Sequence, residues 1–335
     1  MNPKMHRRRA GALLAALPAA LPAALVGLGT TPARAQAYPS RPIRIVVPSA
    51  AGGGNDFIVR TIAPRLEESL RQPVIVENRP GASNIIGTDF VAKSAPDGHT
   101  VLFNGPLILQ AASLYASVPY DPLRDFTPLT DVIRTPLWFA VSTARVKATS
   151  LQEFVAEARA QREPLTYGSG GNGSSHHLYG FGLAEATGIQ MLHVPYKGGA
   201  PAMTALVGGE IAAGFFDFVS LRPFVESGKA RALAVTGTKR HALTPNVPTL
   251  AELGFAGFES YGWGALFVPS RTPAEVVQRL EAEVLKALAH PDVLAKFKAA
   301  GFEIGGTPQA QFAAQVKGDA ARWSSLIRKS ATRLD

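Results

Sequence analysis

A glycine-rich loop is the first stretch of this sequence whose residue types could do chemistry. Residues 43–47 predict a strand, residues 48–56 (PSAAGGGND) a loop, and residues 57–66 a helix that Asn55 or Asp56 could cap. The N–H groups and the positive dipole end at such a helix start attract a carboxylate or phosphate. We therefore expect an anion site here. A tight turn that binds nothing is the alternative.

A second glycine-rich loop follows a strand predicted at residues 165–167. It reads GSGGNGSS over residues 168–175 and leads into a predicted helix. Ligands of wound α/β sheets bind beyond the carboxyl ends of the strands. Two such loops, one in each of two lobes, could hold the two ends of a dicarboxylate and close a hinge around it.

Three other chemistries fit the second loop less well. Residues 168–173 have the G-x-G-x-x-G spacing of a dinucleotide site, but residues 195–197 (PYK) stand where an acid would bind the ribose. The Gly-x-Ser-x-Gly elbow of serine hydrolases is absent. His176 and His177 point to different helix faces, which disfavours a shared metal, and we expect one to pack and the other to face cleft or solvent. The sequence therefore predicts neither a cofactor nor a metal.

The N-terminus has the pattern of a secretory signal peptide over residues 1–35. A basic head precedes an apolar Ala/Leu stretch over residues 10–29 and a small-x-small cleavage site before Gln36. Prolines and glycines interrupt the apolar stretch, which disfavours a membrane anchor. Export by the general secretory or the twin-arginine route is open. Without this segment 29 basic and 25 acidic residues remain, a balance that does not indicate a nucleic-acid partner.

The rest of the chain predicts two wound α/β lobes. The sequence has no cysteine, so its stability must come from its core, and about 300 residues exceed what one core holds efficiently. Strands alternate with helices, which predicts mostly parallel sheets. A strong strand signal at residues 137–141 predicts the first crossing between lobes. We assign residues 36–139 and 260–335 to lobe 1 and residues 140–259 to lobe 2.

Many strings, in order, resemble one family, the solute-binding proteins of tripartite tricarboxylate transporters, also called Bug-type receptors. The strings are YPSRPI (38–43), PSAAGGGND (48–56), ENRPGA (77–82), APDG (95–98), PYDP (119–122), YGSGGNG (167–173), HVPYKG (193–198), GKARALAVT (228–236) and VPT (247–249). The resemblance spans nearly the whole mature chain. It implies a periplasmic receptor with the type II periplasmic-binding-protein fold, whose lobes close on a small carboxylate, aliphatic or aromatic, and deliver it to a membrane permease.

The resemblance also implies which residues hold the ligand. Family members use the loop after the first strand and the Ser/Thr-rich loop of the second lobe. The matching positions are Gly52, Gly53, Gly54 and Asn55 in the first loop, Ser169, Asn172, Gly173, Ser174 and Ser175 in the second, and Tyr196 in the matched HVPYKG string. The full candidate set adds Ser49, Asp56, Ser83, Asn84, His176, Phe216 and Asp217.

Two departures from the family pattern bear on ligand choice. Residues 49–51 (SAA) replace a Phe and a Pro-rich step, which predicts a smaller and more polar cleft wall. An ungapped match puts Phe216 where the family usually has Asp, with Asp217 one position later. We expect a ligand unlike amino acids or citrate, with an aromatic or apolar body. Asp217 could instead cap the helix that follows.

Two other functions are alternatives to that of a transport receptor. A sensor would bind the same carboxylate but dock to an extracytoplasmic signalling domain. A secreted hydrolase would need a nucleophile with its base, or an acid/base pair, and the sequence shows neither in a recognisable arrangement. We therefore expect a monomeric binding protein rather than an enzyme.

Overall fold

The computed structural model describes residues 38–259 and 262–334, and the predicted signal peptide lies outside them. In chain order the elements are β1 (Ile43–Val47), α1 (Gly54–Leu70), β2 (Val74–Asn78), α2 (Ile85–Ala92), β3 (Thr100–Asn104), α3 (Leu107–Leu114), β4 (Phe126–Thr135), β5 (Trp138–Ser142), α4 (Leu151–Ala160), β6 (Leu165–Ser169), α5 (Ser175–Thr187), β7 (Met191–Pro195), α6 (Gly199–Val207), β8 (Ala213–Phe216), α7 (Phe218–Glu226), β9 (Ala230–Val235), β10 (Gly262–Pro269), α8 (Ala274–Leu288), α9 (Pro291–Ala299), β11 (Glu303–Ile304) and α10 (Gln309–Lys329). None of the described helices is long and apolar enough to span a membrane.

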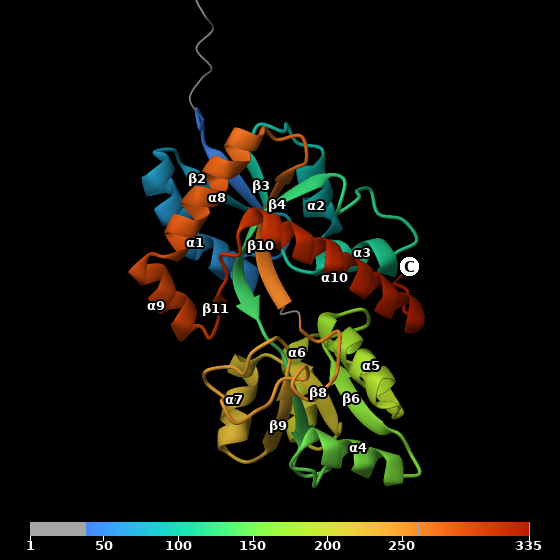
Figure 1. Cartoon of the computed structure of the whole chain (residues 1–335). Coiled ribbons are helices and arrows are strands. Elements are labelled where there is room, and N and C mark those ends of the chain that lie inside the picture. The colour runs from blue at the N-terminus through green and yellow to red at the C-terminus, as the bar shows by residue number, and fades with distance from the viewer. Residues whose placement is uncertain (1–37, 260–261, 335) are drawn as a thin grey trace, which may run out of the picture. The chain divides into compact units, whose positions relative to one another are not determined.

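The strands form two sheets with helices packed around each (Figure 1). The first has the order β11-β4-β10-β3-β1-β2, with β1 parallel to β2 and β3 and with β10 antiparallel to β3 and β4. The second has the order β7-β6-β8-β5-β9, with β6 parallel to β7 and β8. The predicted α/β fold with two wound lobes is confirmed. The expectation of mostly parallel sheets is wrong, because β5 is antiparallel to β8 and β9 and five of the nine strand pairings among the described residues are antiparallel.

Three elements were not predicted from the sequence, namely α3, β4 and β11. Strand β4 contains Pro128, which lacks the N–H that a ladder needs, and such a residue argues against an inner strand. The structure accommodates it at an irregularity, since Leu266 pairs with Thr130 and Phe267 pairs with Pro128, so Leu129 is skipped. The bulge lets a proline sit inside a sheet.

The chain passes between the sheets at Pro136 and Leu137 and returns before β10. Trp138 and Phe139 belong to β5 and pair with Phe216 and Phe215 of the second sheet. The first crossing is tied to the residue that follows β9 in the second lobe: the Leu137 N–H donates to Thr236 Oγ1 (3.0 Å), and the Thr236 N–H donates to the Leu137 carbonyl (2.9 Å).

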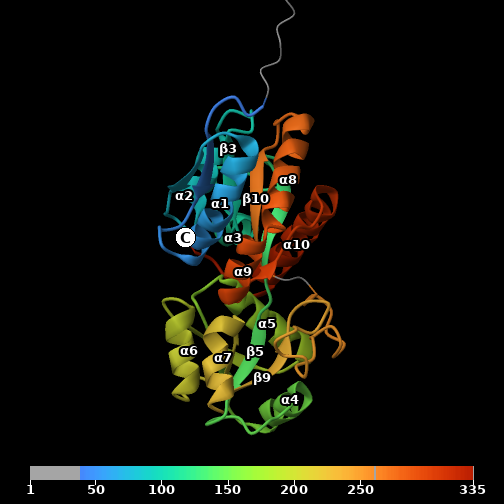
Figure 2. The ribbon, with the colours of Figure 1, turned by 90° about the vertical axis from the view of Figure 1, so that its left-hand side faces the viewer.

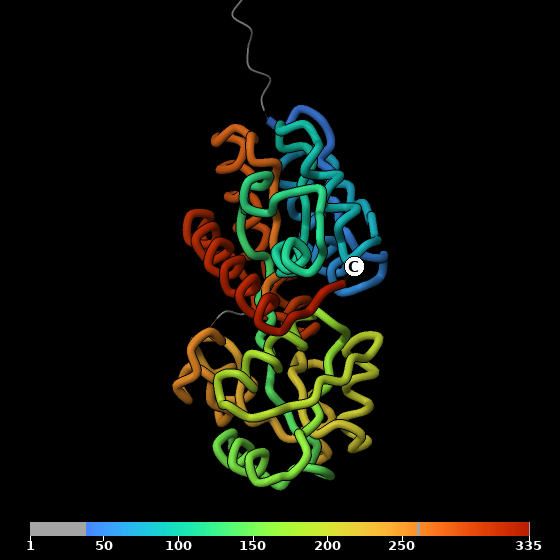
Figure 3. Tube along the Cα trace, turned by 90° about the vertical axis from the view of Figure 1, so that its right-hand side faces the viewer, coloured from blue at the N-terminus to red at the C-terminus, as the bar shows by residue number. Residues whose placement is uncertain are grey.

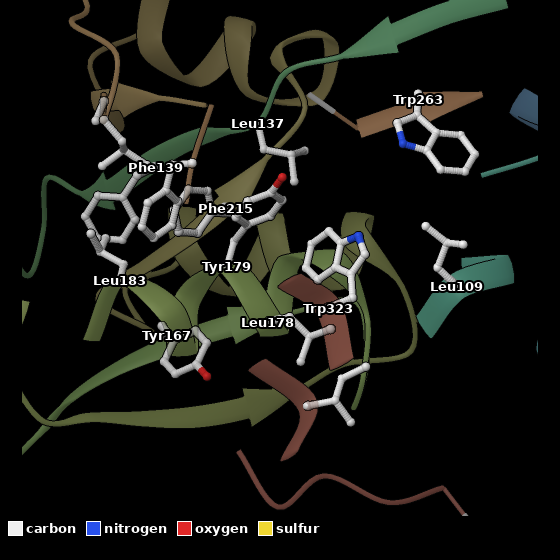
Figure 4. Packing of buried hydrophobic residues seen from close by; sticks show 14 of the residues in the cluster. Leu109, Leu137, Phe139, Tyr167, Leu178, Tyr179, Leu183, Phe215, Trp263 and Trp323 are labelled. Atoms are coloured by element: carbon white, nitrogen blue, oxygen red, sulfur yellow. The ribbon is translucent and has the colours of Figure 1, made fainter. Parts of the chain in front are cut away.

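Helix α10 packs on both lobes (Figures 2 and 3). Its Phe312 meets Trp263 of β10, with ring centroids 5.4 Å apart, and its Trp323 meets Tyr179 of α5 at 5.2 Å. These rings belong to one hydrophobic cluster that continues to Phe215 in the second sheet (Figure 4). The residues from Tyr38 onward accordingly form one compact unit.

Candidate functional site

The first glycine loop ends at the N-terminus of α1. Gly53 is the N-cap, with an extended backbone, so the expectation that Asn55 or Asp56 caps this helix is wrong: both lie in its first turn. The N–H groups of Gly54, Asn55 and Asp56 have no partner within the helix. The glycines are exposed, and no heavy atom lies within 4 Å of a Cβ built at Gly52 or Gly54. A small anion can reach these N–H groups from open solvent.

Asp56 holds the loop in shape. Its buried carboxylate accepts hydrogen bonds from the Gly52 N–H (2.8 Å) and from Arg60 Nε (2.9 Å). The Arg60 guanidinium holds the pKa of the Asp56 carboxyl below its usual range. At the start of the loop, Asn78 Nδ2 donates to the Ser49 carbonyl (3.2 Å). The Ser49 hydroxyl is buried with no hydrogen-bond partner among the described residues, and a bound ligand or water would satisfy it.

The loop between β2 and α2 is strained. Residues 81–84 all have positive φ, between 44° and 132°, although only Gly81 lacks a Cβ. Side-chain contacts hold this shape, because the Ser83 hydroxyl lies 2.7 Å from the Tyr115 hydroxyl and Asn84 Nδ2 donates to Asn104 Oδ1 (3.0 Å). Such strain persists only where the surroundings fix it, so Ser83 and Asn84 are tied to their own lobe.

In the second loop most polar groups bond to one another. Ser174 is the N-cap of α5: its Oγ accepts from the His177 N–H (3.3 Å) and donates to the Gly171 carbonyl (2.7 Å). The buried Ser169 Oγ lies 2.7 Å from His193 Nε2 and 3.0 Å from the same Gly171 carbonyl. These hydroxyls therefore stabilise the loop.

The two adjacent histidines have different surroundings. His177 is 7% exposed, its Nδ1 accepts from the Gly173 N–H (3.0 Å), and its ring stacks on that of His193. Burial lowers the pKa of both His177 and His193 to about 4. His176 is half-buried and lines a cavity. Burial lowers the pKa of His176, and the charge of Asp217 opposes that shift. One histidine packs and the other faces a hollow, as expected.

Helix α3 of the first lobe contacts the second glycine loop. Gln110 Nε2 donates to the Ser175 hydroxyl (3.1 Å), and a Cβ built at Gly173 would lie 2.7 Å from Leu114 Cδ2. Gln110 and Leu114 were not among the predicted site residues because α3 itself was not predicted. Asn172 lies exposed at the tip of the loop.

Tyr196 and Phe216 both belong to the second lobe and pack in the same hydrophobic cluster. Tyr196 is half-buried, its N–H donates to the Ser169 carbonyl (3.0 Å), and burial raises the pKa of its hydroxyl. Phe216 is only 2% exposed and packs in the core, where a Cβ built at Gly214 would lie 2.6 Å from its ring. Neither residue lines the cavity that His176 faces.

That cavity, called here the junction cavity, has a volume of about 450 Å³ and takes its walls from both lobes. It is lined by Thr135, Pro136, Leu137, Trp138, His176, Asp217, Phe218, Val219, Ser220, Ala300, Gly301 and Phe302. Two of the predicted site residues, His176 and Asp217, belong to this set. Asp217 is the N-cap of α7, since its Oδ1 accepts from the Ser220 N–H (2.9 Å). The Phe302 ring lies 6.4 Å from that of Phe57 in the first turn of α1, although no residue of the first glycine loop lines the cavity itself.

Sequence reasoning missed the aromatic walls of the junction cavity. Phe218 lies two residues after the carboxyl end of β8, and this position was the one available signal for it. No local sequence pattern marks Phe302 as a cavity residue, because only the return of the chain after α9 brings it to the cavity.

The arrangement is suited to binding. It combines exposed N–H groups at a helix start, a hydroxyl at Ser49 and a cavity of a size typical for small ligands. Within the ranges that the structure describes, no group of three or more His, Cys, Asp or Glu could hold a metal ion.

Comparison with known proteins finds relatives of this chain. Residues 58–332 match the model of the tripartite tricarboxylate transporter family receptor. A UPF0065 protein in the tcbD-tcbE intergenic region of Pseudomonas sp. (strain P51) is 39% identical over 90% of this chain and 91% of its own length. Protein BugT of Bordetella pertussis is 35% identical over 90% of this chain and 93% of its own length.

Solved structures of similar proteins share the fold. A TctC solute-binding protein from Polaromonas without ligand has a TM-score of 0.79 and 30% identity over 87% of this chain and 99% of its own. Rpa4515 of R. palustris with adipate has a TM-score of 0.72 and 32% identity over 89% of this chain and 100% of its own. MatC of Rhodopseudomonas palustris with bound malate has a TM-score of 0.69 and 29% identity over 87% of this chain and 100% of its own. The Polaromonas neighbour is a solute-binding protein, and the other two were solved with the carboxylates adipate and malate.

Proposed function

This chain belongs to the family of tripartite tricarboxylate transporter receptors, and from that we propose that it captures a small carboxylate between its lobes and delivers it to a membrane permease. The observation that carries the proposal is the open N-terminus of α1, where the N–H groups after Gly53 face solvent and the Asp56–Arg60 pair fixes the loop. Backbone N–H groups at a helix start bind a carboxylate without a charged partner. The two relatives solved with adipate and malate support this ligand class.

Capture requires the lobes to close around the ligand. We propose the predicted lobes, residues 36–139 with 260–335 and residues 140–259, as the two moving parts, with the correction that Trp138 and Phe139 move with the second sheet, which they join. The hinge then includes the first crossing at Pro136 and Leu137, where Leu137 bonds to Thr236 of the second lobe. Hinges of this kind are a few residues between elements that absorb changes in φ and ψ. The location that fits is the periplasm, which the chain would reach by means of the signal peptide predicted at residues 1–35.

A ligand screen on the chain from Gln36 onward tests the proposal. Thermal shift measures ligands that bind the folded state, because such ligands raise the melting temperature by mass action. We expect aliphatic or aromatic carboxylates to raise it, and their neutral amides to leave it unchanged. A neutral amide that raises the melting temperature as much as its acid would contradict the proposal.

Two glycine variants locate the site. Gly53 has an extended backbone, and a Cβ there meets only the Ala50 carbonyl oxygen at 3.4 Å, so Gly53→Val folds but covers the N–H groups. We expect it to weaken carboxylate binding at least about tenfold. Gly318→Val on α10, also with open space around its Cβ, is the matched control and keeps wild-type affinity. Equal affinities of the two variants would refute the assigned site.

A further inference from the structure

The junction cavity is apolar on most of its wall. Phe218 lies against Trp138 with ring centroids 4.9 Å apart, and the indole N–H of Trp138 is already bonded to Thr244 Oγ1 (3.0 Å). From the first lobe, Phe302 is half-buried at the same cavity. Val219 is 51% exposed, and its Cγ2 lies 2.2 Å from a Cβ built at Gly301, so both lobes supply apolar surface here. A ligand group that enters this cavity meets rings and methyl groups.

The polar groups of the cavity carry no positive charge. Asp217 is the one acidic side chain among the described lining residues, and no Lys or Arg is among them. Its carboxylate accepts hydrogen bonds from the N–H and the hydroxyl of Ser220. His176 stays neutral at pH 7 because burial lowers its pKa. A carboxylate placed here would be desolvated beside Asp217 without a cation to pair with.

We propose that the junction cavity takes the uncharged, apolar end of a monocarboxylate. The inference rests on the proposed function, in which the ligand carboxylate lies at the N–H groups of the first glycine loop. Phe57 lies in the first turn of α1 and its ring is 6.4 Å from that of Phe302 in the cavity wall, which brings the start of α1 near this cavity. The receptor therefore prefers aromatic or aliphatic monocarboxylates to dicarboxylates, in contrast to the relatives solved with adipate and malate.

Isothermal titration calorimetry with matched ligands tests this preference. Hexanoate and adipate have the same number of carbons and differ in whether the far end is a methyl group or a carboxylate; 3-phenylpropanoate adds an aromatic end. We expect hexanoate and 3-phenylpropanoate to bind at least about tenfold more tightly than adipate. Tighter binding of adipate overturns the inference while leaving the proposed carboxylate receptor intact. If none of the panel of mono- and dicarboxylates binds, the proposed function fails as well.

An ammonium group is the competing occupant, because a carboxylate among aromatic rings also suits a cation. Phenylalanine carries the carboxylate and ring of 3-phenylpropanoate with an added ammonium. If Asp217 recognises that ammonium, phenylalanine binds more tightly than 3-phenylpropanoate. This result would overturn the proposal that the cavity takes an uncharged ligand end. We expect the reverse order.

Two variants with a control locate the preference in the cavity. Val219→Lys places a cation in the cavity wall, and we expect the affinity for adipate to rise at least about tenfold relative to the affinity for hexanoate. Asp217→Asn removes the negative charge but keeps an N-cap side chain for α7. We expect the ratio of the affinity for hexanoate to the affinity for adipate to decrease in this variant. Leu192→Lys, at a residue 58% exposed on β7 and outside the cavity, leaves the ratio unchanged. An unchanged ratio in both cavity variants refutes the inference.

Discussion

The imidazole rings of His177 and His193 stack with their centroids 3.8 Å apart and their planes 15° apart, next to the second glycine loop. His193 Nε2 lies 2.7 Å from Ser169 Oγ, and His177 Nδ1 accepts from the Gly173 N–H. An acceptor at Nδ1 requires a neutral His177 ring, and two charged rings at this distance would repel each other. The loop therefore has this shape only while the stack is uncharged.

This stack makes stability fall in acid. The pKa of His177 is about 4 in the folded state, below its unfolded value of 6.5, so its contribution is present above pH 6.5 and is lost as pH falls through 4. One pKa unit corresponds to about 1.4 kcal/mol, so we expect the free energy of unfolding to drop by roughly 3 kcal/mol through His177 alone. Urea denaturation at pH 7, 5.5 and 4 measures this drop.

A His177→Asn variant isolates the titrating group, since its side-chain oxygen can still accept from Gly173. We expect the variant to lose less stability in acid than the wild type. His290→Asn is the control, because His290 is an exposed N-cap and Asn can take that role. Identical acid profiles for wild type and His177→Asn would contradict the role of the stack.

The close approach of Gly173 to Leu114 makes a second prediction. Gly173 has φ of 73°, and Gly188 has φ of 64°, but only at Gly173 would a Cβ meet another side chain, at 2.7 Å. Gly188→Ala should cost about 1 kcal/mol from backbone strain. Gly173→Ala should cost a further 1 to 3 kcal/mol from overpacking. Equal losses in chemical denaturation would show that α3 does not press on this loop.

Arg322 joins α10 to the second lobe. Its guanidinium donates to the Tyr179 hydroxyl (3.2 Å) and the Gly257 carbonyl (3.0 Å) and pairs with Asp319 (3.3 Å). Because this group is largely buried, we expect Arg322→Ala to lower the free energy of unfolding by about 2 to 3 kcal/mol. Arg328→Ala on the exposed side of the same helix should cost less than about 0.5 kcal/mol. Similar small losses in both would argue against α10 as a link between the lobes.

Local patterns were enough to predict much of the framework. The apolar run of β1, the glycines after it and the helix that follows appear in the sequence in that order, and the structure has them. The caps at Ser174 of α5 and Ser150 of α4 follow an equally local rule, because a hydroxyl that precedes a helical pattern satisfies an N–H of its first turn.

The walls of the cavity and the contact across the lobes were not predictable in this way. Phe216 and Phe218 are two residues apart and equally apolar, yet the first packs in the core and the second lines the cavity. The choice depends on where β8 ends and α7 begins. The hydrogen bond from Gln110 to Ser175 joins residues 65 positions apart, and tertiary packing alone brings such pairs together.

Amide chemical shifts during titration test the carboxylate site most directly. With the tightest-binding acid of the thermal-shift screen as ligand, we expect the largest changes at the N–H groups of Gly54 and Asn55 in the first lobe and of Phe218 and Val219 in the second, all with the same saturation curve. Both lobes would then contact one ligand. If the largest changes instead fall on residues around Arg134 and Arg322, at the separate cavity of about 520 Å³ that they line, the carboxylate binds elsewhere and the proposed site is wrong.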